Sequence, residues 1–328
     1  MNPLSEAFEA SDRGCGLDSS VRMRALVTGA AGFIGSHLVE ALLDRGDEVA
    51  ILDHLTRTPR PWFAAALGRG ARLHVADVRD LAAVRQAFAA EHPDVVLHLA
   101  AQVDVRRSVA DPPLDVQVNV AGTVSVLEAA RETDVRRIVF ASSAAAYGDP
   151  ERLPTSEDAP IAPLSPYGAS KAAAEWYLAQ YSRLHSISAV ALRMANVYGP
   201  RQDPHRESGV VAIFCGAAAE DRPVTVFGDG TQTRDYVYVG DVVDAWLAAA
   251  ESDVTTALNI STGRETTLLE LVELLGVDRE MQPARPGEIA RSCLDPTRAA
   301  TELGWRAHVP LAEGLRRTLE ALGAAAAG

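Results

Sequence analysis

The sequence predicts an α/β fold built on a doubly wound parallel sheet, followed by a smaller mixed α/β part. Two observations carry this prediction. From residue 24 onward, short apolar segments of strand length alternate with longer amphipathic segments, and a glycine triplet lies between the first strand and the first helix. With 328 residues, of which 48% are hydrophobic, the chain can bury one large core or two coupled cores.

The first elements are a strand at 25–28, a helix at 33–46 and a strand at 49–53, which is the order of a βαβ unit. Later apolar segments also have the length of buried strands: 72–78, 94–100, 137–143 and 189–195. Amphipathic segments at 81–92 and 119–132 separate these strands as helices. Such alternation is typical of a sheet with helices on both faces.

Three parts are expected along the chain. Residues 1–22 lack periodicity and are interpreted as a loose extension, so a chain that begins at Met23 should keep full activity. Residues 23–195 should form the sheet domain. Loops after this point are richer in Pro, Arg and Asp, so residues 196–328 are assigned mainly to a smaller domain, from which 235–255 rejoin the first.

Charge and cysteine usage limit the partners and the location. A net charge of −13 argues against a surface for nucleic acid or for an anionic membrane, although a local arginine site could still bind phosphate. No apolar run reaches the ~18 to 20 residues of a membrane helix, and the first residues lack the apolar core of a signal peptide. Cys15, Cys215 and Cys293 are odd in number and far apart, which favours free thiols and a cytoplasmic protein.

The segment TGAAGFIG predicts a dinucleotide site. Gly29, Gly32 and Gly35 follow a strand and open a helix, where glycine permits a tight turn and lets a pyrophosphate approach the helix N-terminus. The second strand ends in Asp53, whose carboxylate can accept hydrogen bonds from an adenosine ribose and repels an added phosphate. The sheet is therefore predicted to be of Rossmann type, with NAD favoured over NADP.

One helix start predicts a catalytic base. Ser165 is a suitable N-cap and Pro166 a suitable first residue, which places Tyr167 in the first turn, near the positive end of the helix dipole. A tyrosine has a pKa of about 10 and needs a nearby cation to act as a base near neutral pH. Lys171, one turn later, is the only lysine in the chain, and the planar fork of arginine does not replace its compact ammonium. The alternative is a solvated helix face on which Lys171 pairs with Glu175.

Other strand ends carry polar side chains. Asp77 and Val78 are either adenine contacts or an ordinary strand end. Ser142 and Ser143 end a strand at the edge where ligands bind in such sheets, so a hydroxyl there can bind a substrate oxygen. His98 lies within an apolar strand and is interpreted as a hydrogen-bonded core residue, and no metal is expected.

Several segments together resemble the extended short-chain dehydrogenase/reductase family, and within it the nucleotide-sugar epimerases. They are TGAAGFIG (28–35), Asp53, HLAAQ (98–102), SSAAAYG (142–148), YGASK (167–171), NVYGPRQDP (196–204) and TRDYVYVGD (233–241). The similarity extends from Met23 to about Arg306. It implies that NAD is bound by further residues besides the glycines and strand ends: Phe33, Ile34, Ala100, Tyr167 and Lys171.

The resemblance also implies the chemistry. In the family the catalytic serine precedes the tyrosine of the S-S-x-x-x-Y-G segment by four residues, which selects Ser143. Related sugar dehydratases carry Asp-Glu at the next two positions and decarboxylases carry Glu at the second, whereas this chain has Ala144 and Ala145. The expected enzyme is an NAD-dependent isomerase that inverts carbon 4 of a UDP-sugar through a 4-keto intermediate. The alternatives are a UDP-glucuronate 4-epimerase, a sugar dehydratase and a non-catalytic NAD-binding sensor.

Substrate contacts implied by the resemblance lie mostly in the second half of the chain. Arg234 and Arg285 are expected at the diphosphate, with Asn196 beside them. The stretch that contains Val226 resembles a uracil-contacting strand but fits a buried strand equally well. Ser292 stands where some members have a bulky tyrosine, which would leave room for an N-acetyl group, so UDP-glucose, UDP-galactose and the N-acetyl pair are the expected substrates.

Assembly is a further implication of the resemblance. The helices expected at 114–132 and 166–185 are similar to the pair that forms the dimer surface in the family. A homodimer is therefore expected.

Overall fold

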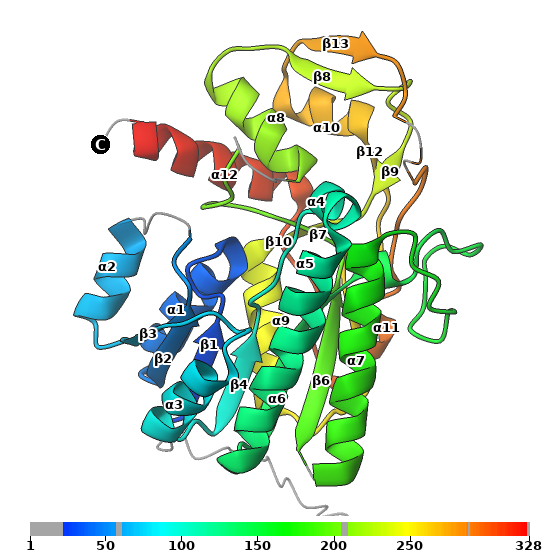
Figure 1. Ribbon diagram of the computed structural model, residues 1–328. Coiled ribbons are helices and arrows are strands. Elements are labelled where there is room, and N and C mark those ends of the chain that lie inside the picture. The colour runs from blue at the N-terminus through cyan, green and yellow to red at the C-terminus, as the bar shows by residue number, and fades with distance from the viewer. Residues whose placement is uncertain are drawn as a thin grey trace, which may run out of the picture.

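The computed structural model describes residues 22–56, 61–185, 187–204, 209–285, 287 and 289–326. The predicted extension at 1–22 therefore lies outside the described residues, apart from residue 22. At the centre is a seven-stranded sheet in the order β11-β6-β5-β4-β1-β2-β3 (Figure 1), in which all neighbouring strands are parallel. Its strands are β1 (Arg24–Thr28), β2 (Glu48–Asp53), β3 (Arg72–Val75), β4 (Val95–His98), β5 (Arg137–Ser143), β6 (Ser188–Met194) and β11 (Leu258–Ile260).

This arrangement confirms the predicted Rossmann-type α/β fold, with some strands shorter than predicted and one additional strand. The third strand ends at Val75 instead of residue 78, because Asp77 starts a turn in which its carboxylate accepts the amide of Arg79. The edge strand β11 was not predicted from its three residues. It pairs with β6 and extends the sheet on that side.

Helices cover both faces of the sheet, so its central strands are buried on both sides. Successive residues of β1 show this, because Val27 belongs to one hydrophobic core and Leu26 to the other. The first core also receives side chains from α1 (Phe33–Arg45), α2 (Pro61–Gly68) and α9 (Val239–Glu251). The second core receives them from α3 (Leu81–Glu91), α6 (Gly122–Glu132) and α7 (Pro166–His185).

Short helices lead into α6 along the rim of the sheet. They are α4 (Val105–Ala110), α5 (Pro112–Val116) and a π-helical turn (Gln117–Ala121). A 3₁₀ turn (Ala144–Ala146) follows β5, and α11 (Thr297–Glu302) contacts β11. Among the helices of the described chain, none combines the length and the apolarity needed to cross a bilayer.

The remaining elements form a smaller group above the sheet in Figure 1, around a third hydrophobic core. It contains three two-stranded sheets: β7 (Asn196–Tyr198) with β10 (Tyr236–Tyr238), β8 (Val224–Phe227) with β13 (Arg279–Gln282), and β9 (Thr233–Arg234) with β12 (Thr266–Thr267). Its helices are α8 (Val210–Ala219), α10 (Leu268–Leu275) and α12 (Leu311–Ala326). Between these elements the chain returns to the central sheet with α9, which packs against α1, β4 and β5, and with β11.

Candidate active site

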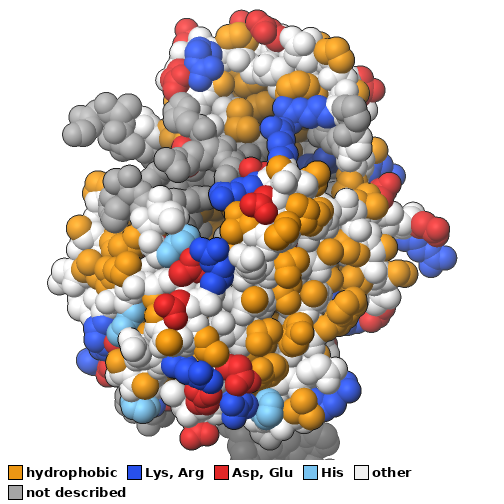
Figure 2. Space-filling model, in the orientation of Figure 1, with side chains coloured by type: hydrophobic (Ala, Val, Ile, Leu, Met, Phe, Trp, Pro, Cys, Tyr) orange, Lys and Arg blue, Asp and Glu red, His pale blue; other side chains and the backbone are white. Residues whose placement is uncertain are grey.

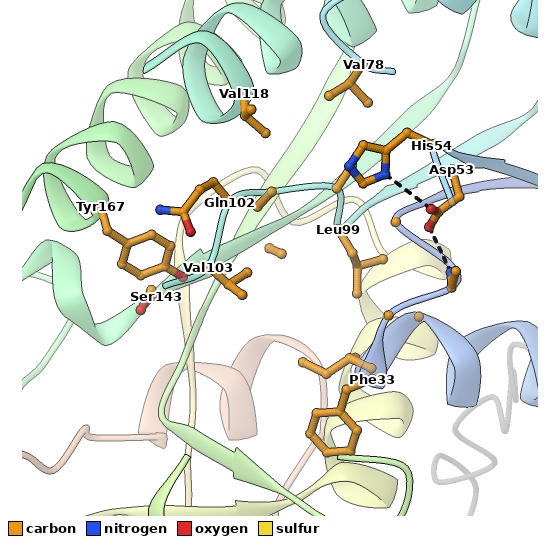
Figure 3. Close-up of a pocket in the computed structure, with 18 of the residues that line it drawn as sticks. Phe33, Asp53, His54, Val78, Leu99, Gln102, Val103, Val118, Ser143 and Tyr167 are labelled. Carbon is orange, nitrogen blue, oxygen red and sulfur yellow. Dashed lines mark hydrogen bonds and ion pairs between the residues drawn. The ribbon is translucent and has the colours of Figure 1, made fainter. Parts of the chain in front are cut away.

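A cavity of about 970 Å³ opens at the carboxyl ends of the central strands (Figure 3). It brings together residues that are far apart in the sequence but were all expected to bind the cofactor. These residues are Gly29, Gly32, Phe33, Ile34, Gly35, Asp53, Asp77, Val78, Ala100, Tyr167 and Lys171. Ser143 and Asn196 line the same cavity, so the predicted catalytic and cofactor groups share one space.

The glycine turn has the shape that a pyrophosphate site requires. Gly29 has φ +69°, and a Cβ on it would lie 2.6 Å from the backbone nitrogen of Ala100, so only glycine fits between β1 and β4. A Cβ on Gly35 would lie 2.6 Å from the carbonyl oxygen of Gly29. Gly32 caps α1, whose first-turn amides have no acceptor within the helix. These residues therefore fit the diphosphate of a dinucleotide.

Asp53 marks the ribose end of this site, at the carboxyl end of β2. Its Oδ2 accepts the amide of Ala31 and its Oδ1 accepts the amide of Leu55, each at 2.9 Å. Burial opposes ionisation of this carboxyl, but hydrogen bonds from His54 and from the two amides outweigh it, so the pKa of Asp53 is lowered. The group is thus an ionised acceptor, which suits ribose hydroxyls better than a phosphate.

The start of α7 has the predicted geometry. Ser165 Oγ accepts the amide of Gly168 at 3.1 Å, and the amide of Tyr167 donates to Ser108 Oγ at 3.1 Å. Figure 3 shows the Tyr167 hydroxyl beside Ser143 on the cavity wall. Burial raises the pKa of Tyr167 to about 12, and its hydrogen bond with Ser143 opposes this rise.

Lys171 is buried in the wall behind Tyr167. Only 3% of its surface is exposed, its Nζ donates to the carbonyl oxygen of Ala141 at 2.8 Å, and Nζ lies 5.8 Å from the centroid of the Tyr167 ring. Burial lowers the pKa of Lys171 to about 8. The expectation that this cation lowers the pKa of Tyr167 is not met in this arrangement, because burial of the phenol dominates.

The alternative pairing of Lys171 with Glu175 is not found. Arg193 on β6 donates to both carboxylate oxygens of Glu175, at 2.6 Å from Nη2 and 3.0 Å from Nε. Both Ser142 and Ser143 line the cavity, but Ser142 Oγ also donates to Glu175. The hydroxyl of Ser142 is therefore already engaged with Glu175. Only Ser143 can bind a ligand without breaking that buried hydrogen bond.

His98 confirms the interpretation of a hydrogen-bonded core residue. Its Nδ1 lies 2.7 Å from Thr28 Oγ1, and its Nε2 lies 3.0 Å from Thr123 Oγ1. Burial lowers the pKa of His98 to about 3, so the imidazole is neutral. Because Thr123 Oγ1 donates to the carbonyl oxygen of Asn119, it accepts from Nε2–H, and Nδ1 is left to accept from Thr28.

The predicted substrate residues divide into two groups. Asn196 lies in the cavity, whereas Arg234, Arg285 and Ser292 lie outside its described lining. Ser292 donates its amide to the carbonyl oxygen of Thr233 at 3.2 Å, which brings it beside the predicted diphosphate arginine at position 234.

Two further substrate predictions fall on β8 and its neighbour. The guanidinium carbon of Arg285 lies 3.5 Å from the ring centroid of Phe227, at the end of β8. Val226 is fully buried in the third core, so its side chain does not reach a ligand. The burial of Val226 fits the buried-strand interpretation, and contact of the stretch with uracil stays a prediction.

The polar residues of the cavity wall that were not predicted are His54, Thr56, Arg79, Gln102, Arg107, Gln202 and Asp203. His54 and Arg79 stand near Asp53 and Asp77, and Gln102 and Arg107 stand near Tyr167. Arg79 Nη2 lies 2.6 Å from Asp77 Oδ2, which fixes its direction. The segment HLAAQ contains Gln102 and was the signal that could have pointed to it, whereas Arg107 has no local pattern that separates it from other exposed arginines.

One group in the described part of the chain has donor atoms spaced for a metal ion, all within 4.8 Å of one another. Its members are Asp241, Asp244 and His308, outside the active-site cavity. Asp241 already accepts the amides of His308 and Val309, at 3.2 and 3.0 Å, and these bonds account for its burial at the start of α9. That the protein works without a metal remains a prediction.

Comparison with known proteins gives the family. The model of the NAD dependent epimerase/dehydratase family matches residues 25–261. The chain belongs to this family. A UDP-glucose 4-epimerase of Mycolicibacterium smegmatis is 46% identical over 316 residues, covering 91% of this chain and 98% of the relative.

Two solved structures of family members are similar over nearly the whole chain. The UDP-glucose 4-epimerase of Thermotoga maritima with UDP-glucose is 40% identical with a TM-score of 0.87, covering 92% of this chain and 99% of that one. The UDP-glucose 4-epimerase of Thermus thermophilus with NAD is 45% identical with a TM-score of 0.83, covering 91% and 98%.

Proposed function

We propose that this protein is an NAD-dependent UDP-sugar 4-epimerase. The observation that carries the proposal is the position of Tyr167 beside Ser143, in the cavity that also holds the glycine turn and Asp53. The 46% identity to a UDP-glucose 4-epimerase over most of both chains supports it. Ala144 and Ala145, which form the turn after β5, offer no acid or base for loss of water or of carbon dioxide.

Each of the three catalytic groups has a task that its environment suits. Tyr167 takes the proton of the sugar 4-hydroxyl, and Ser143 hydrogen-bonds the same oxygen. Lys171, buried and held by the carbonyl oxygen of Ala141, binds cofactor hydroxyls and keeps a positive charge near the phenol. Bound NAD supplies the hydride acceptor and, when oxidised, a positive charge that favours the phenolate.

The glycine turn and the strand ends account for cofactor binding in this proposal. Gly29, Gly32 and Gly35 receive the diphosphate, Asp53 the adenosine ribose, and Asp77 with Val78 the adenine side. Residues 23–195, with 235–255, are assigned to this NAD-binding part, and the remainder of 196–328 mainly to substrate.

The proposed substrate is a UDP-sugar, with UDP-glucose and UDP-galactose as the first pair. Arg234 and Arg285 bind the diphosphate together with Asn196, which lines the cavity. The small side chain of Ser292 beside the β9 segment leaves room for an N-acetyl group, so the N-acetyl pair is proposed as well.

A panel of UDP-, dTDP- and GDP-sugars tests this function. We expect purified protein to carry NAD and to interconvert UDP-glucose and UDP-galactose, with products separated by mass spectrometry after chromatography. Transient absorbance of reduced nicotinamide should accompany turnover. A protein that binds NAD but neither reduces it nor forms product with any sugar would instead be a sensor, and turnover only of the glucose pair would remove the N-acetyl proposal.

We also infer that the protein forms a homodimer through the helices at 114–132 and 166–185, which span the end of α5, the π-helical turn, α6 and α7. Figure 2 shows hydrophobic side chains gathered over α5, α6 and α7, and large apolar side chains on these helices are exposed: Val116, Trp176, Tyr177 and Leu184. Exposed aromatic residues of this kind commonly dominate binding between subunits. Two such helical faces can supply the ~1,600 Å² of a standard interface.

A cytoplasmic location is inferred as well, because Cys215 and Cys293 are buried free thiols.

Substitution of Trp176 tests the dimer. Trp176→Glu places a charge at a side chain that is 64% exposed, so it should weaken the dimer at least tenfold while leaving the fold intact. Leu274→Glu on α10 introduces the same charge at an apolar residue outside the surface and should leave the dimer unchanged. Light scattering across a concentration series measures both. A monomeric wild type, or equal dissociation of the two variants, would refute the interface.

A further inference from the structure

A buried carboxylate close to the proposed catalytic groups has no role in the mechanism above. Asp115 lies on α5, which packs against α4 and α7, and its side chain is fully buried. Its Oδ1 accepts from Gln102 Nε2 at 3.0 Å and from Asn119 Nδ2 at 3.1 Å. Its Oδ2 is buried without a hydrogen bond to any described residue. A carboxylate held only by neutral amides is costly to bury.

Hydrogen bonds connect Asp115 mechanically to the start of α7. The amide of Asn119 also donates to Ser170 Oγ at 3.1 Å, and Ser170 Oγ donates to the carbonyl oxygen of Tyr167 at 2.9 Å. Gln102, the second partner, receives the amide of Asp104 and lines the cavity beside Tyr167 in Figure 3. The carboxylate therefore anchors two amides that surround the proposed base.

The same carboxylate acts electrostatically on both members of the proposed pair. Burial is the main cause that lowers the pKa of Lys171, and Asp115 opposes it by favouring the ammonium. Burial is also the main cause that raises the pKa of Tyr167, and Asp115 adds to it by disfavouring the phenolate. Removing the negative charge of Asp115 would therefore lower the pKa of Lys171 and the pKa of Tyr167. This holds although lysine is charged when protonated and tyrosine is charged when deprotonated.

The other charges near this point are compensated or face the solvent. Glu175, which also favours the ammonium of Lys171, is paired with Arg193, and His98 is neutral. The charged or basic groups on the elements packed against α5 are Asp104, Arg106 and Arg107 on or before α4, and Lys171, Glu175, Arg183 and His185 on α7. Within the described residues, none of these cations forms an ion pair with Asp115, so its field is not cancelled locally.

We propose that Asp115 is a positioning residue that controls where protons reside in the active site. It keeps the proton on both Lys171 and Tyr167 in the resting site, and it holds Gln102 and Asn119 against the start of α7. Proton removal from Tyr167 then depends on the positive charge that bound NAD supplies. Tyr167 would therefore stay protonated until the ligands are bound. The proposal rests on the proposed epimerase function for its effect on turnover, but the lysine titration below does not.

The single lysine makes the first test direct. Protein grown with ¹³C-labelled lysine gives one side-chain signal, because Lys171 is the only lysine in the chain. Its titration midpoint should fall by about one pH unit in Asp115→Asn, since an anion that favours the ammonium has been removed. Asp115→Glu, which retains the charge, should titrate near wild type.

Asp111→Asn is the matched control. It removes the same charge four residues away on the surface, and asparagine still caps α5, where Asp111 Oδ1 accepts the amide of Leu114. Solvent screens this position, so the lysine midpoint should stay within ~0.2 pH unit of wild type. Circular dichroism and the unfolding temperature confirm that each variant is folded, and Asp115→Ser replaces Asp115→Asn if the latter does not fold.

The second test is the dependence of turnover on pH. Both limbs of the profile for Asp115→Asn should move to lower pH, the acid limb with Tyr167 and the basic limb with Lys171. A merely structural role would lower turnover at every pH without moving the limbs. An unchanged lysine midpoint in a folded charge-free variant would overturn the proposal. Absence of epimerase activity in wild type would overturn the proposed function, and the lysine titration would still decide the role of Asp115.

Discussion

Tyr167→Phe is expected to lower kcat by about 10³-fold while NAD and substrate still bind, because it removes only the hydroxyl that takes the sugar proton. The ring keeps its packing at the start of α7, where the backbone amide of Tyr167 donates to Ser108. KM should change little, since the loss concerns the transition state more than the bound substrate.

Steady-state kinetics on the active sugar pair, with NAD content measured after denaturation, tests this expectation. Tyr177→Phe makes the same change on the same helix at a side chain that is 45% exposed, and it should leave kcat within about twofold. Equal turnover of Tyr167→Phe and wild type would show that another group removes the proton.

Lys171→Arg is expected to lower kcat by about 10²-fold and to weaken NAD retention. The site is closed around a compact ammonium, which donates to the carbonyl oxygen of Ala141 at 2.8 Å and lies 4.9 Å from the centroid of the Phe140 ring. A guanidinium has more atoms and a planar set of donors, so it cannot occupy this space without moving β5 or Tyr167.

The dependence of activity on pH separates the effect of the larger arginine side chain from the effect of its permanent charge in Lys171→Arg. Lys171 has a pKa lowered to about 8 by burial, so a basic limb of activity should arise as its ammonium is lost. Arginine stays charged throughout the accessible range, so residual activity of Lys171→Arg should lack that limb. Turnover and NAD content equal to wild type would show that the active site does not require a lysine at position 171.

Much of the cavity can be predicted from the sequence because many of its residues belong to short motifs of neighbouring residues. A glycine turn after a strand, an N-cap at Ser165 and a tyrosine with a lysine one turn later each depend on neighbours in the chain. The strands of the sheet are visible as apolar segments for the same reason.

What escaped prediction depends on contacts between distant segments. The pairing of Glu175 with Arg193, 18 positions away, was not predicted, since periodicity shows only partners on the same helix, such as the alternative partner Lys171. Asp115 belongs to a short helix whose burial comes from α7, so its sequence resembles a polar surface turn. The raised pKa of Tyr167 is likewise a product of burial, which spacing alone does not reveal.

The route of the chain between the sheet and the upper layer limits how the protein could be divided. A fragment that ends at Met194 would lack Trp246 of α9 and Ile260 of β11, both of which have no exposed surface. The polypeptide leaves the sheet after β6, returns for these two elements and departs again toward α10 and α12. No single cut in the chain separates two fragments that each keep a complete hydrophobic core. The cofactor-binding part therefore cannot fold as an independent domain, because its core includes residues from the last third of the chain.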